Sequence, residues 1–275
     1  MKPIQLAISG VYGRMGQALI QALETSNENF SLVAALNHSE GKRVNNQQVV
    51  LNSRPINIES SLEALLRKQK IDVLIDFTQP LGTIDYLSLC EQHHIAFVIG
   101  TTGFNEDQKQ AIIKAARTIP IVLAPNFSIG VNLSFALTAL TARILSNSYD
   151  VEIIEAHHKH KIDAPSGTAL ALAEAVTKAR YSTLEKTAVY CRAGQLKPRE
   201  KGTIGFASIR AGDIVGEHTV MFASEGERLE ITHKASNRLT FAKGALQAAA
   251  WLKEKAPGLY SMHDVLGLTQ LLNQS

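Results

Sequence analysis

The stretch Ile4-Gln-Leu-Ala-Ile-Ser-Gly-Val-Tyr-Gly-Arg-Met-Gly16 decides the fold expected of this 275-residue chain. Its first six residues form a short apolar run that predicts a strand, and glycines follow at positions 10, 13 and 16. Residues 17–23 then have the apolar periodicity of a helix. This order suits a dinucleotide, because its pyrophosphate can sit on the helix N-terminus. A tight turn without a ligand is the alternative, since the spacing is G-x-x-G-x-x-G rather than G-x-G-x-x-G.

Strands and helices alternate from this stretch to about residue 125. The pattern predicts further strands at 31–36, 71–77, 95–99 and 120–124, and helices at 59–69, from 78 onward and at 105–118. Pro80 suits the first turn of the second of these helices, and Asn105 suits the N-cap of the third. Residues 45–57 are polar and irregular and predict a loop. The alternation predicts an α/β fold with a doubly wound parallel sheet.

The pattern changes after residue 128. Residues 129–145 predict a long apolar helix between two domains, and strands are predicted at 151–156, 203–210, 218–222 and 228–233. With one helix at 167–180, this predicts a smaller α+β domain with a mostly antiparallel sheet. Helices are also predicted at 240–253 and 264–272. We therefore expect a dinucleotide-binding domain of residues 1–128 with 239–275, and a substrate-binding and oligomerisation domain of residues 129–238.

Composition excludes several classes of protein. The net charge of +3 is too small to indicate nucleic-acid binding, and the aromatic content of 6% does not suggest base stacking. Cys90 and Cys191 are far apart and predict free thiols in a reducing compartment. The N-terminus lacks the pattern of a signal peptide, and we found no lipid-facing run of about 20 residues. We therefore expect a cytoplasmic protein without a membrane or nucleic-acid partner.

The strand that ends before Asn37-His38 bears on the choice of cofactor. In a dinucleotide-binding fold this strand end meets the adenosine ribose, usually through Asp or Glu. Asn37 does not repel a 2′-phosphate as an acid would, and His38 and Arg14 carry groups that attract one. This favours NADPH, with NADH left open. The ends of the later strands carry Thr78, residues 100–102 and residues 125–127, which suit ribose and nicotinamide or are merely capped turns.

A second stretch, Glu155-Ala-His-His-Lys-His-Lys-Ile-Asp-Ala-Pro-Ser-Gly-Thr168, concentrates titratable side chains. Its histidines and lysines interleave in a loop that lies between a predicted strand and a predicted helix. Ser166 is a suitable N-cap for that helix. Imidazole and ammonium groups near a helix N-terminus suit an anionic ligand and proton transfer. A solvated loop, a nucleic-acid patch or a metal site are the alternatives. Glu217, His218 and His233 carry the groups of an acid–base site, but as strand residues that face solvent or a subunit interface they are predicted to be structural.

These motifs together resemble the dihydrodipicolinate reductase family, which is also called 4-hydroxy-tetrahydrodipicolinate reductase. The resemblance rests on the glycine turn, on Gly100-Thr-Thr-Gly-Phe104, on Asn126-Phe-Ser and above all on residues 155–168. It extends over essentially the whole chain, including 210–218 and 232–236. It implies NAD(P)H-dependent reduction of a cyclic dicarboxylate to tetrahydrodipicolinate in diaminopimelate and lysine biosynthesis. It also implies a homotetramer.

The resemblance assigns roles to individual residues. It implies that His157 is the acid–base residue and Lys161 the proton donor, and that His158, Gly167 and Thr168 contact the substrate. Ser166 lies in the same helix start, whose N–H groups suit carboxylates. With Asn37 and His38, the implied cofactor contacts are Gly10, Val11, Tyr12, Gly13, Arg14, Met15, Gly100, Thr101, Thr102, Ala124, Pro125, Asn126 and Phe127. No metal is expected.

Two positions depart from the family pattern. Some members carry an acid followed by arginine where this chain has Asn37-His38, and some carry arginine where it has Gln79. These departures leave the choice between NADPH and NADH open. Two other classes are also open: a different oxidoreductase of the same architecture, such as an amino-acid dehydrogenase, and a non-enzymatic NAD(P)-sensing or metal-binding protein that uses the histidines.

Overall fold

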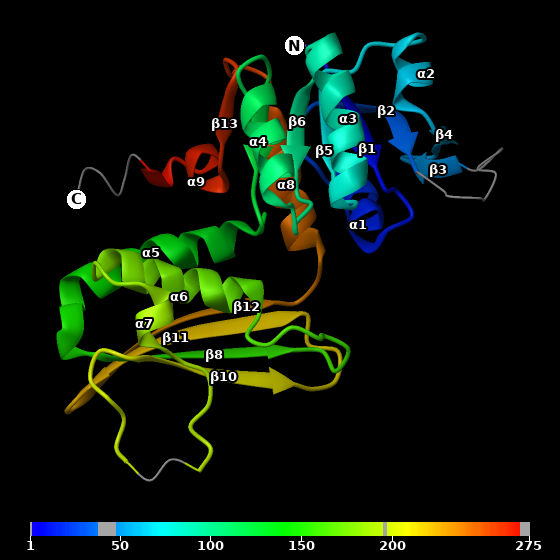
Figure 1. The fold of residues 1–275 in the computed structure, drawn as a ribbon. Helices are drawn as coiled ribbons and strands as arrows, with labels where there is room; N and C mark the ends of the chain where they lie inside the picture. The colour runs from blue at the N-terminus through cyan, green and yellow to red at the C-terminus, as the bar shows by residue number, and fades with distance from the viewer. Residues whose placement is uncertain (1, 38–47, 195–196, 270–275) are drawn as a thin grey trace. The chain divides into compact units, whose positions relative to one another are not determined.

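The computed structural model describes residues 2–37, 48–194 and 197–269, which divide into two compact units (Figure 1). The first unit comprises residues 1–129 and 238–267, and the second comprises residues 130–237 and 268–275. Each unit has its own sheet and its own buried apolar residues.

The sheet of the first unit has the strand order β13-β7-β6-β5-β1-β2-β4-β3. All neighbouring strands in it are parallel except the antiparallel pair β3 and β4. The doubly wound parallel sheet is therefore confirmed. The strands are β1 (Ile4–Ser9), β2 (Phe30–Leu36), β3 (Gln48–Leu51), β4 (Arg54–Glu59), β5 (Val73–Asp76), β6 (Ala96–Ile99), β7 (Pro120–Leu123) and β13 (Gly258–Tyr260).

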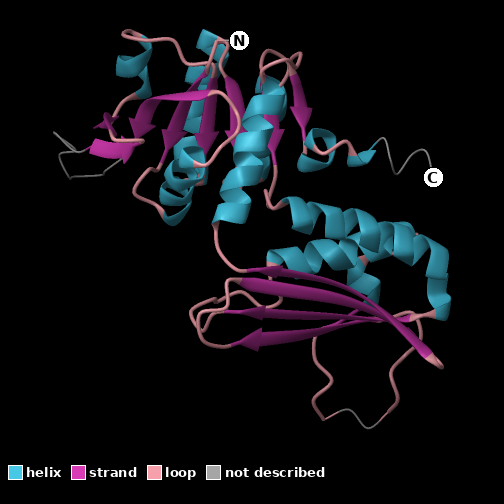
Figure 2. Ribbon diagram, turned by 180° about the vertical axis from the view of Figure 1, so that it is seen from behind, coloured by secondary structure: helices cyan, strands magenta, loops and turns pink. Residues whose placement is uncertain are grey.

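Helices cover both faces of this sheet (Figure 2). Leu6 and Ile8 of β1 point to the cluster that holds α1 and α8, whereas Ala7 between them points to the cluster that holds α3 and α4. This alternation is the two-residue period of a strand, and apolar residues on both sides are typical of a parallel sheet. The helices are α1 (Arg14–Glu24), α2 (Leu62–Leu66), α3 (Pro80–His93), α4 (Glu106–Ala115), α8 (Leu239–Leu252) and α9 (Met262–Val265).

Local capping signals correctly placed two of these helices. Pro80 occupies the first turn of α3, where its missing N–H has no cost. Asn105 caps α4 and forms a capping box with Gln108, each side chain accepting a backbone N–H at 2.9 Å.

Three predictions in this unit were wrong. Residues 48–59 form the β3–β4 hairpin rather than a loop, because Asn52 and Ser53 take left-handed conformations that make a tight turn. The helix predicted at 59–69 is shortened to α2, because β4 continues to Glu59 and Ser61 caps the helix. The helix predicted at 264–272 is interrupted, because α9 ends at Val265 and the chain turns at Gly267 with a φ of 69°; residues 270–272 lie outside the described residues.

The sheet of the second unit has the order β12-β11-β8-β10-β9. Central β8 (Asp150–His157) pairs antiparallel with β11 (Gly216–Ser224), which pairs antiparallel with β12 (Glu227–Ala235). On its other side β8 pairs parallel with β10 (Ile204–Arg210), and β10 with the short β9 (Ala188–Val189). Most paired residues are antiparallel, as predicted.

Helices lie on one face of this sheet (Figure 2). They are α5 (Ile129–Leu145), which has the bounds predicted from the sequence, α6 (Gly167–Ala179) and α7 (Leu184–Thr187). Val151 and Ile153 of β8 pack with Leu172 and Val176 of α6 to form the core. This packing buries one face of β8 and thereby places the polar residues at its end.

One helical stretch is long and apolar enough to cross a membrane by those two criteria alone. It comprises α5 and the following 3₁₀ turn, 129–148, and 33% of its most apolar window is buried. Helices inside water-soluble proteins pass the same test, so the stretch is weak evidence for a membrane span.

Candidate active site

The carboxyl end of β8 carries two polar side chains into the covered face of the second sheet. Val151, Ile153, Glu155 and His157 are all buried and occupy every second position of β8, so all four side chains point to the side of α6. Glu155 is 1% exposed and His157 is 9% exposed. A carboxylate and an imidazole two residues apart on a strand therefore share one buried environment.

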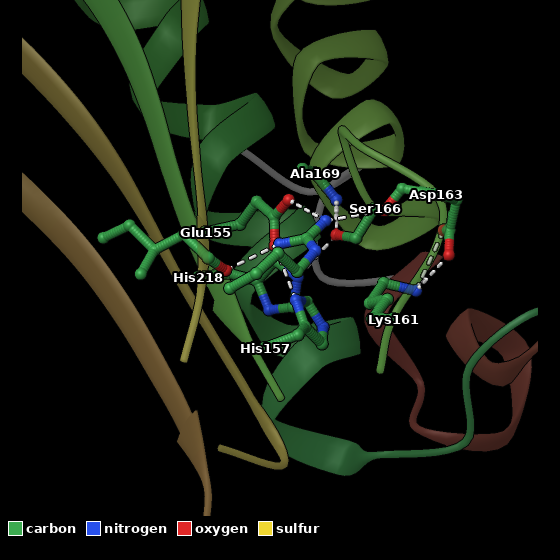
Figure 3. Close-up of polar contacts among 9 residues, drawn as sticks. Glu155, His157, Lys161, Asp163, Ser166, Ala169 and His218 are labelled. Atoms are coloured by element: carbon green, nitrogen blue, oxygen red, sulfur yellow. Dashed lines mark hydrogen bonds and ion pairs between the residues drawn. The ribbon is translucent and has the colours of Figure 1, made fainter. Parts of the chain in front are cut away.

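Glu155 is held by Arg210 and by the imidazole of His157, which is drawn beside it in Figure 3. Arg210 Nη1 and Nη2 donate to the two carboxylate oxygens at 2.9 and 2.7 Å, and His157 Nδ1 lies 2.5 Å from Glu155 Oε2. Arg210 Nη2 also donates to the backbone oxygen of Asp163 at 2.6 Å. The register explains the arrangement, since Arg210 on β10 lies beside His157 on β8. The sequence reasoning gave neither Glu155 nor Arg210 a role.

Burial and hydrogen bonding act in opposite directions on this pair. Burial raises the pKa of Glu155, but hydrogen bonds from Arg210, Ser208 and His157 outweigh it and lower that pKa to about 2. Burial is the largest influence on the pKa of His157 and lowers it, while Glu155 opposes this shift and Lys161 adds to it. At neutral pH, Glu155 is therefore an anion and His157 a neutral imidazole.

His218 on β11 is the third member of this cluster, although the sequence reasoning expected it to face solvent or an interface. It lies directly across from Glu155 in the antiparallel register and is 6% exposed. Its Nε2 lies 2.9 Å from Ser166 Oγ, and its ring centre lies 5.0 Å from that of His157. Burial is the main cause that lowers the pKa of His218 to about 3, so His218 is also a neutral imidazole at neutral pH.

The loop after β8 brings Lys161 and the start of α6 close to this cluster (Figure 3). Lys161 Nζ donates to both carboxylate oxygens of Asp163, at 2.7 and 2.9 Å. Ser166 caps α6, as predicted, and accepts the N–H of Ala169 at 3.2 Å. Gly167 and Thr168 form the first turn of that helix. All six predicted catalytic and substrate-binding residues therefore lie in the second unit, within residues 157–168.

His158 is half-buried, and its ring lies 6.3 Å from that of His160. Its Nδ1 is buried and has no hydrogen-bond partner among the residues that the structure describes. Lys159 and His160 are exposed. A buried nitrogen without a partner is available to a ligand.

The cluster also has a spacing that a metal ion could use. The donor atoms of Glu155, His157 and His218 all lie within 4.8 Å of one another. However, Arg210 already occupies both oxygens of Glu155, and a cation there would have to compete with the guanidinium. Hydrogen bonds therefore account for the arrangement without a metal.

The glycine turn of the first unit has the close packing expected for a βα turn that meets a phosphate. Gly10 has a φ of 67° and accepts the N–H of Gly13 at 2.8 Å. A Cβ at Gly16 would lie 2.3 Å from the Gly10 oxygen, so only glycine fits there. Tyr12 is exposed, and α1 begins at Arg14 and includes Met15.

The other predicted cofactor contacts lie at the ends of neighbouring parallel strands. Gly100, Thr101 and Thr102 follow β6, and Ala124, Pro125, Asn126 and Phe127 follow β7. Three of the predicted side chains, those of Val11, Ala124 and Phe127, are buried in the core. These three would meet a cofactor through their backbone. Asn37 follows β2 and donates its N–H to Glu59, whereas His38 lies outside the described residues.

A buried carboxylate joins these strand ends. Asp76, the last residue of β5, is 0% exposed and accepts hydrogen bonds from four hydroxyls. Thr78 and Thr101 donate at 2.7 and 2.9 Å, and Ser9 and Thr83 complete the set. Among the described residues, no cation pairs with Asp76. The sequence reasoning missed this residue because Asp76 ends an otherwise apolar run.

Known proteins match both units. Residues 4–127 match the family model described as dihydrodipicolinate reductase, N-terminus, and residues 130–266 match the model described as dihydrodipicolinate reductase, C-terminus. The chain belongs to the dihydrodipicolinate reductase family. It is similar to the dipicolinate-bound dihydrodipicolinate reductase from Paenisporosarcina sp. TG-14, with 30% identity, a TM-score of 0.76, and coverage of 94% of this chain and 97% of that one.

Membership of the dihydrodipicolinate reductase family establishes several points. The chain is an oxidoreductase, a 4-hydroxy-tetrahydrodipicolinate reductase of lysine and diaminopimelate biosynthesis, with a Rossmann-like fold that binds a nicotinamide cofactor. The predicted family, fold class and enzyme class are confirmed.

More distant structures share only the fold. A myo-inositol dehydrogenase from Corynebacterium glutamicum aligns with 13% identity and a TM-score of 0.59, covering 98% of this chain and 95% of that one. An amine dehydrogenase from Mycobacterium smegmatis aligns with 10% identity and a TM-score of 0.56, covering 94% and 95%.

Proposed function

We propose that this reductase transfers a hydride from NADPH or NADH to 4-hydroxy-tetrahydrodipicolinate, with Lys161 as the proton donor and His157 as the acid–base residue, and that the 4-hydroxyl group leaves as water. The observation that carries the proposal is the buried, neutral imidazole of His157. Its Nδ1 is engaged by Glu155, and it lies in the same unit as Lys161 and the N-terminus of α6. This arrangement supports proton transfer by His157 next to cationic and N–H groups that suit a dicarboxylate.

His157 has one nitrogen fixed and one nitrogen available. A carboxylate can only accept, so His157 Nδ1 carries the proton that it shares with Glu155. The neutral ring then has its lone pair on Nε2. Gly216 keeps the space beside Nε2 clear, because a Cβ at that position would lie 3.1 Å from it. Nε2 is the atom that we assign to proton exchange with the substrate.

Lys161 and the start of α6 fit the charge of the substrate. The Lys161 side chain is 21% exposed, and its ammonium group is held by Asp163. A substrate carboxylate can replace Asp163 as its partner. The N–H groups of Gly167 and Thr168, together with the capping residue Ser166, offer a second anion site. His158, with its unpartnered Nδ1, supplies one more donor.

The cofactor is assigned to the first unit. A nicotinamide nucleotide bound there supplies the hydride. The backbone of the Gly10–Met15 turn would hold its pyrophosphate, and residues 100–102 and 124–127 would contact ribose and nicotinamide. Asn37 puts no negative charge at the ribose, so we favour NADPH while NADH is also accepted. The dinucleotide-binding part comprises residues 1–128 with 239–275 in this proposal, and the substrate part comprises 129–238.

Two properties of the whole protein are also proposed. We infer a homotetramer, supported by the one-sided covering of the second sheet: α5 and α6 lie on one face of it. We infer a cytoplasmic location from the exposed thiol of Cys191 and the buried thiol of Cys90, neither of which forms a disulfide.

The test is turnover of 4-hydroxy-tetrahydrodipicolinate, followed by NAD(P)H absorbance. We expect His157→Ala and Lys161→Ala each to lower kcat by about 100-fold or more while the protein stays folded. Lys159→Ala and His160→Ala are matched controls from the same loop, and we expect them to keep near-normal kcat. Equal rates in all four variants would place the acid elsewhere. Absence of turnover by the wild type would point to a different dehydrogenase.

The metal alternative has its own experiment. The protein is purified, its metal content is measured, and activity is assayed before and after dialysis against a chelator. Full activity after metal removal is the result that we expect. Loss of activity, with recovery on adding Zn²⁺, would instead support a metal at Glu155, His157 and His218.

A further inference from the structure

We propose that Glu155, held by Arg210, is a positioning residue that fixes His157 in the Nδ1–H tautomer and turns Nε2 toward the substrate. This inference rests on the proposed acid–base role of His157. It extends that role to two residues that do not themselves meet the substrate.

The geometry leaves the carboxylate little freedom. Arg210 uses two nitrogens to hold both oxygens of Glu155, and it is itself fixed by the backbone oxygens of Ile209 and Asp163. The planar guanidinium therefore sets the plane of the carboxylate. That carboxylate in turn receives Nδ1 of His157 at 2.5 Å. A rotation of the imidazole about its own axis would break this bond in a site where water cannot replace it.

The same contact adjusts the charge of the imidazole. Charged or titratable groups face His157 from every element packed against it: Glu155 from β8, Arg210 from β10, His218 from β11 and Lys161 from the loop. Only Glu155 in this set favours the imidazolium, and the two cations oppose it. Glu155 therefore lets His157 accept a proton in a site that otherwise resists positive charge.

The strand supplies a matched control for a purely structural role. Glu152 lies three residues earlier on β8 and points to the opposite face. It also forms a bidentate pair, with Arg192 Nη1 and Nη2 each at 2.8 Å. The substitution Glu152→Gln removes the same kind of ion pair from the same strand without touching His157.

The experiment compares Glu155→Gln with Glu152→Gln in the full-length protein. We expect Glu155→Gln to lower kcat about 100-fold with little change in the substrate KM, and to move the pH limb that reports His157 to lower pH. The sign follows because the charge that favours the imidazolium is lost. Glu152→Gln is expected to change neither quantity. Gel filtration on each variant checks its assembly.

A second variant separates charge from position. Glu155→Asp keeps the negative charge but withdraws it by one methylene, so we expect lower kcat with a pH limb close to that of the wild type. Wild-type kcat and an unmoved limb in Glu155→Gln would overturn the proposal. If His157→Ala is also fully active, the proposed function fails; if only His157→Ala is impaired, the positioning role alone fails.

The first unit carries an independent case, and we propose that Asp76 is a positioning residue for the cofactor-binding edge. Its four hydroxyl partners come from separate segments: Ser9 precedes Gly10, Thr78 and Thr83 lie around the start of α3, and Thr101 follows β6. Ser9 and Thr101 thus tie the glycine turn and the Gly100–Thr102 segment to one buried group. A change at Asp76 should alter both segments together.

Asp76→Asn tests this with cofactor binding rather than turnover. The new amide NH₂ faces hydroxyls that all donate, so at least one of them must turn away. We expect the Kd for NADPH, measured by fluorescence titration well below the melting temperature, to rise about tenfold. Asp72→Asn is the control, because Asp72 lies at the amino end of β5, whereas Asp76 lies at its carboxyl end. Asp72 forms an ion pair with Lys70 and accepts the Gln5 N–H.

Further measurements distinguish a failure of the proposed role of Asp76 from a failure of the proposed cofactor. Ser9→Ala removes one donor and is expected to raise the Kd about threefold, which keeps the test open if Asp76→Asn does not fold. A folded Asp76→Asn protein with the wild-type Kd would overturn the proposal. Failure of the wild type to bind NADPH and NADH would instead contradict the proposed cofactor.

Discussion

Two glutamates of β8 each pair with an arginine, and the two pairs differ in how far they are exposed to water. Glu155–Arg210 and Glu152–Arg192 are both bidentate, with similar nitrogen–oxygen distances. The Glu155 side chain is 1% exposed, whereas that of Glu152 is 29% exposed. Water can replace the partner of Glu152 but not that of Glu155, so the buried pair alone can impose a fixed geometry on a neighbour. The imidazole of His157 is that neighbour.

The largest difference is expected when each arginine is removed. Arg210→Ala leaves Glu155 buried without its cation, so we expect a loss of about 3–5 kcal/mol in the free energy of unfolding. Arg192→Ala should cost about 1 kcal/mol or less, because Glu152 is partly exposed to water and keeps Arg199 as a second partner at 3.3 Å. Urea unfolding followed by circular dichroism measures both. Equal losses would mean that burial does not distinguish the pairs.

Acid unfolding gives the next difference. The pKa of Glu155 is about 2 in the folded protein and 4.5 ordinarily, so its ionised form stabilises the fold above pH 4.5. This stabilisation, about 3 kcal/mol, is lost as the pH falls from 4.5 toward 2. Glu155→Gln should therefore flatten the dependence of stability on pH in that window. An unchanged slope in Glu155→Gln would contradict the assignment.

The smallest effects are expected when alanine replaces Gly216, which lies beside His157, or Gly205, which lies beside Glu152. A Cβ at Gly216 would lie 3.1 Å from His157 Nε2, so Gly216→Ala should crowd the reacting nitrogen and lower kcat about tenfold with little loss of stability. A Cβ at Gly205 would lie 2.1 Å from Glu152 Oε2, so Gly205→Ala should lower stability and leave kcat unchanged. Steady-state kinetics and thermal melts on both variants check this. Lower kcat in Gly205→Ala alone would reverse the roles of the two faces.

Local signals predicted much of the fold. The bounds of α5 and the starts of α3 and α4 followed from apolar periodicity, from Pro80 and from the Asn105 cap, each of which acts within a few residues. The β3–β4 hairpin escaped prediction because its strands are short and β4 contains Pro55, a residue that disfavours a strand. β13 also escaped, since three residues give no period and β13 forms only by pairing with β7.

The candidate site divides in the same way. His157, Lys161 and Ser166 lie within ten residues of one another, so a sequence motif could indicate them. Glu155 lies in that motif too, but its neighbours come from other strands. Arg210 lies 55 residues later in the sequence, on β10, and His218 lies directly opposite Glu155 on β11. Strand register brings them together, and register is a property of the folded sheet. The period of β11, on which His218 alternates inward, was the one available signal.

The most direct measurement of the central claim is the tautomer of His157. ¹⁵N-histidine labelling, with His157→Gln used to assign the signal, distinguishes a protonated from an unprotonated ring nitrogen at neutral pH. We expect a neutral ring with the proton on Nδ1 and a bare Nε2. We also expect this signal to change in Glu155→Gln but not in Glu152→Gln. A ring protonated on Nε2 alone, or a signal that ignores Glu155, would contradict it.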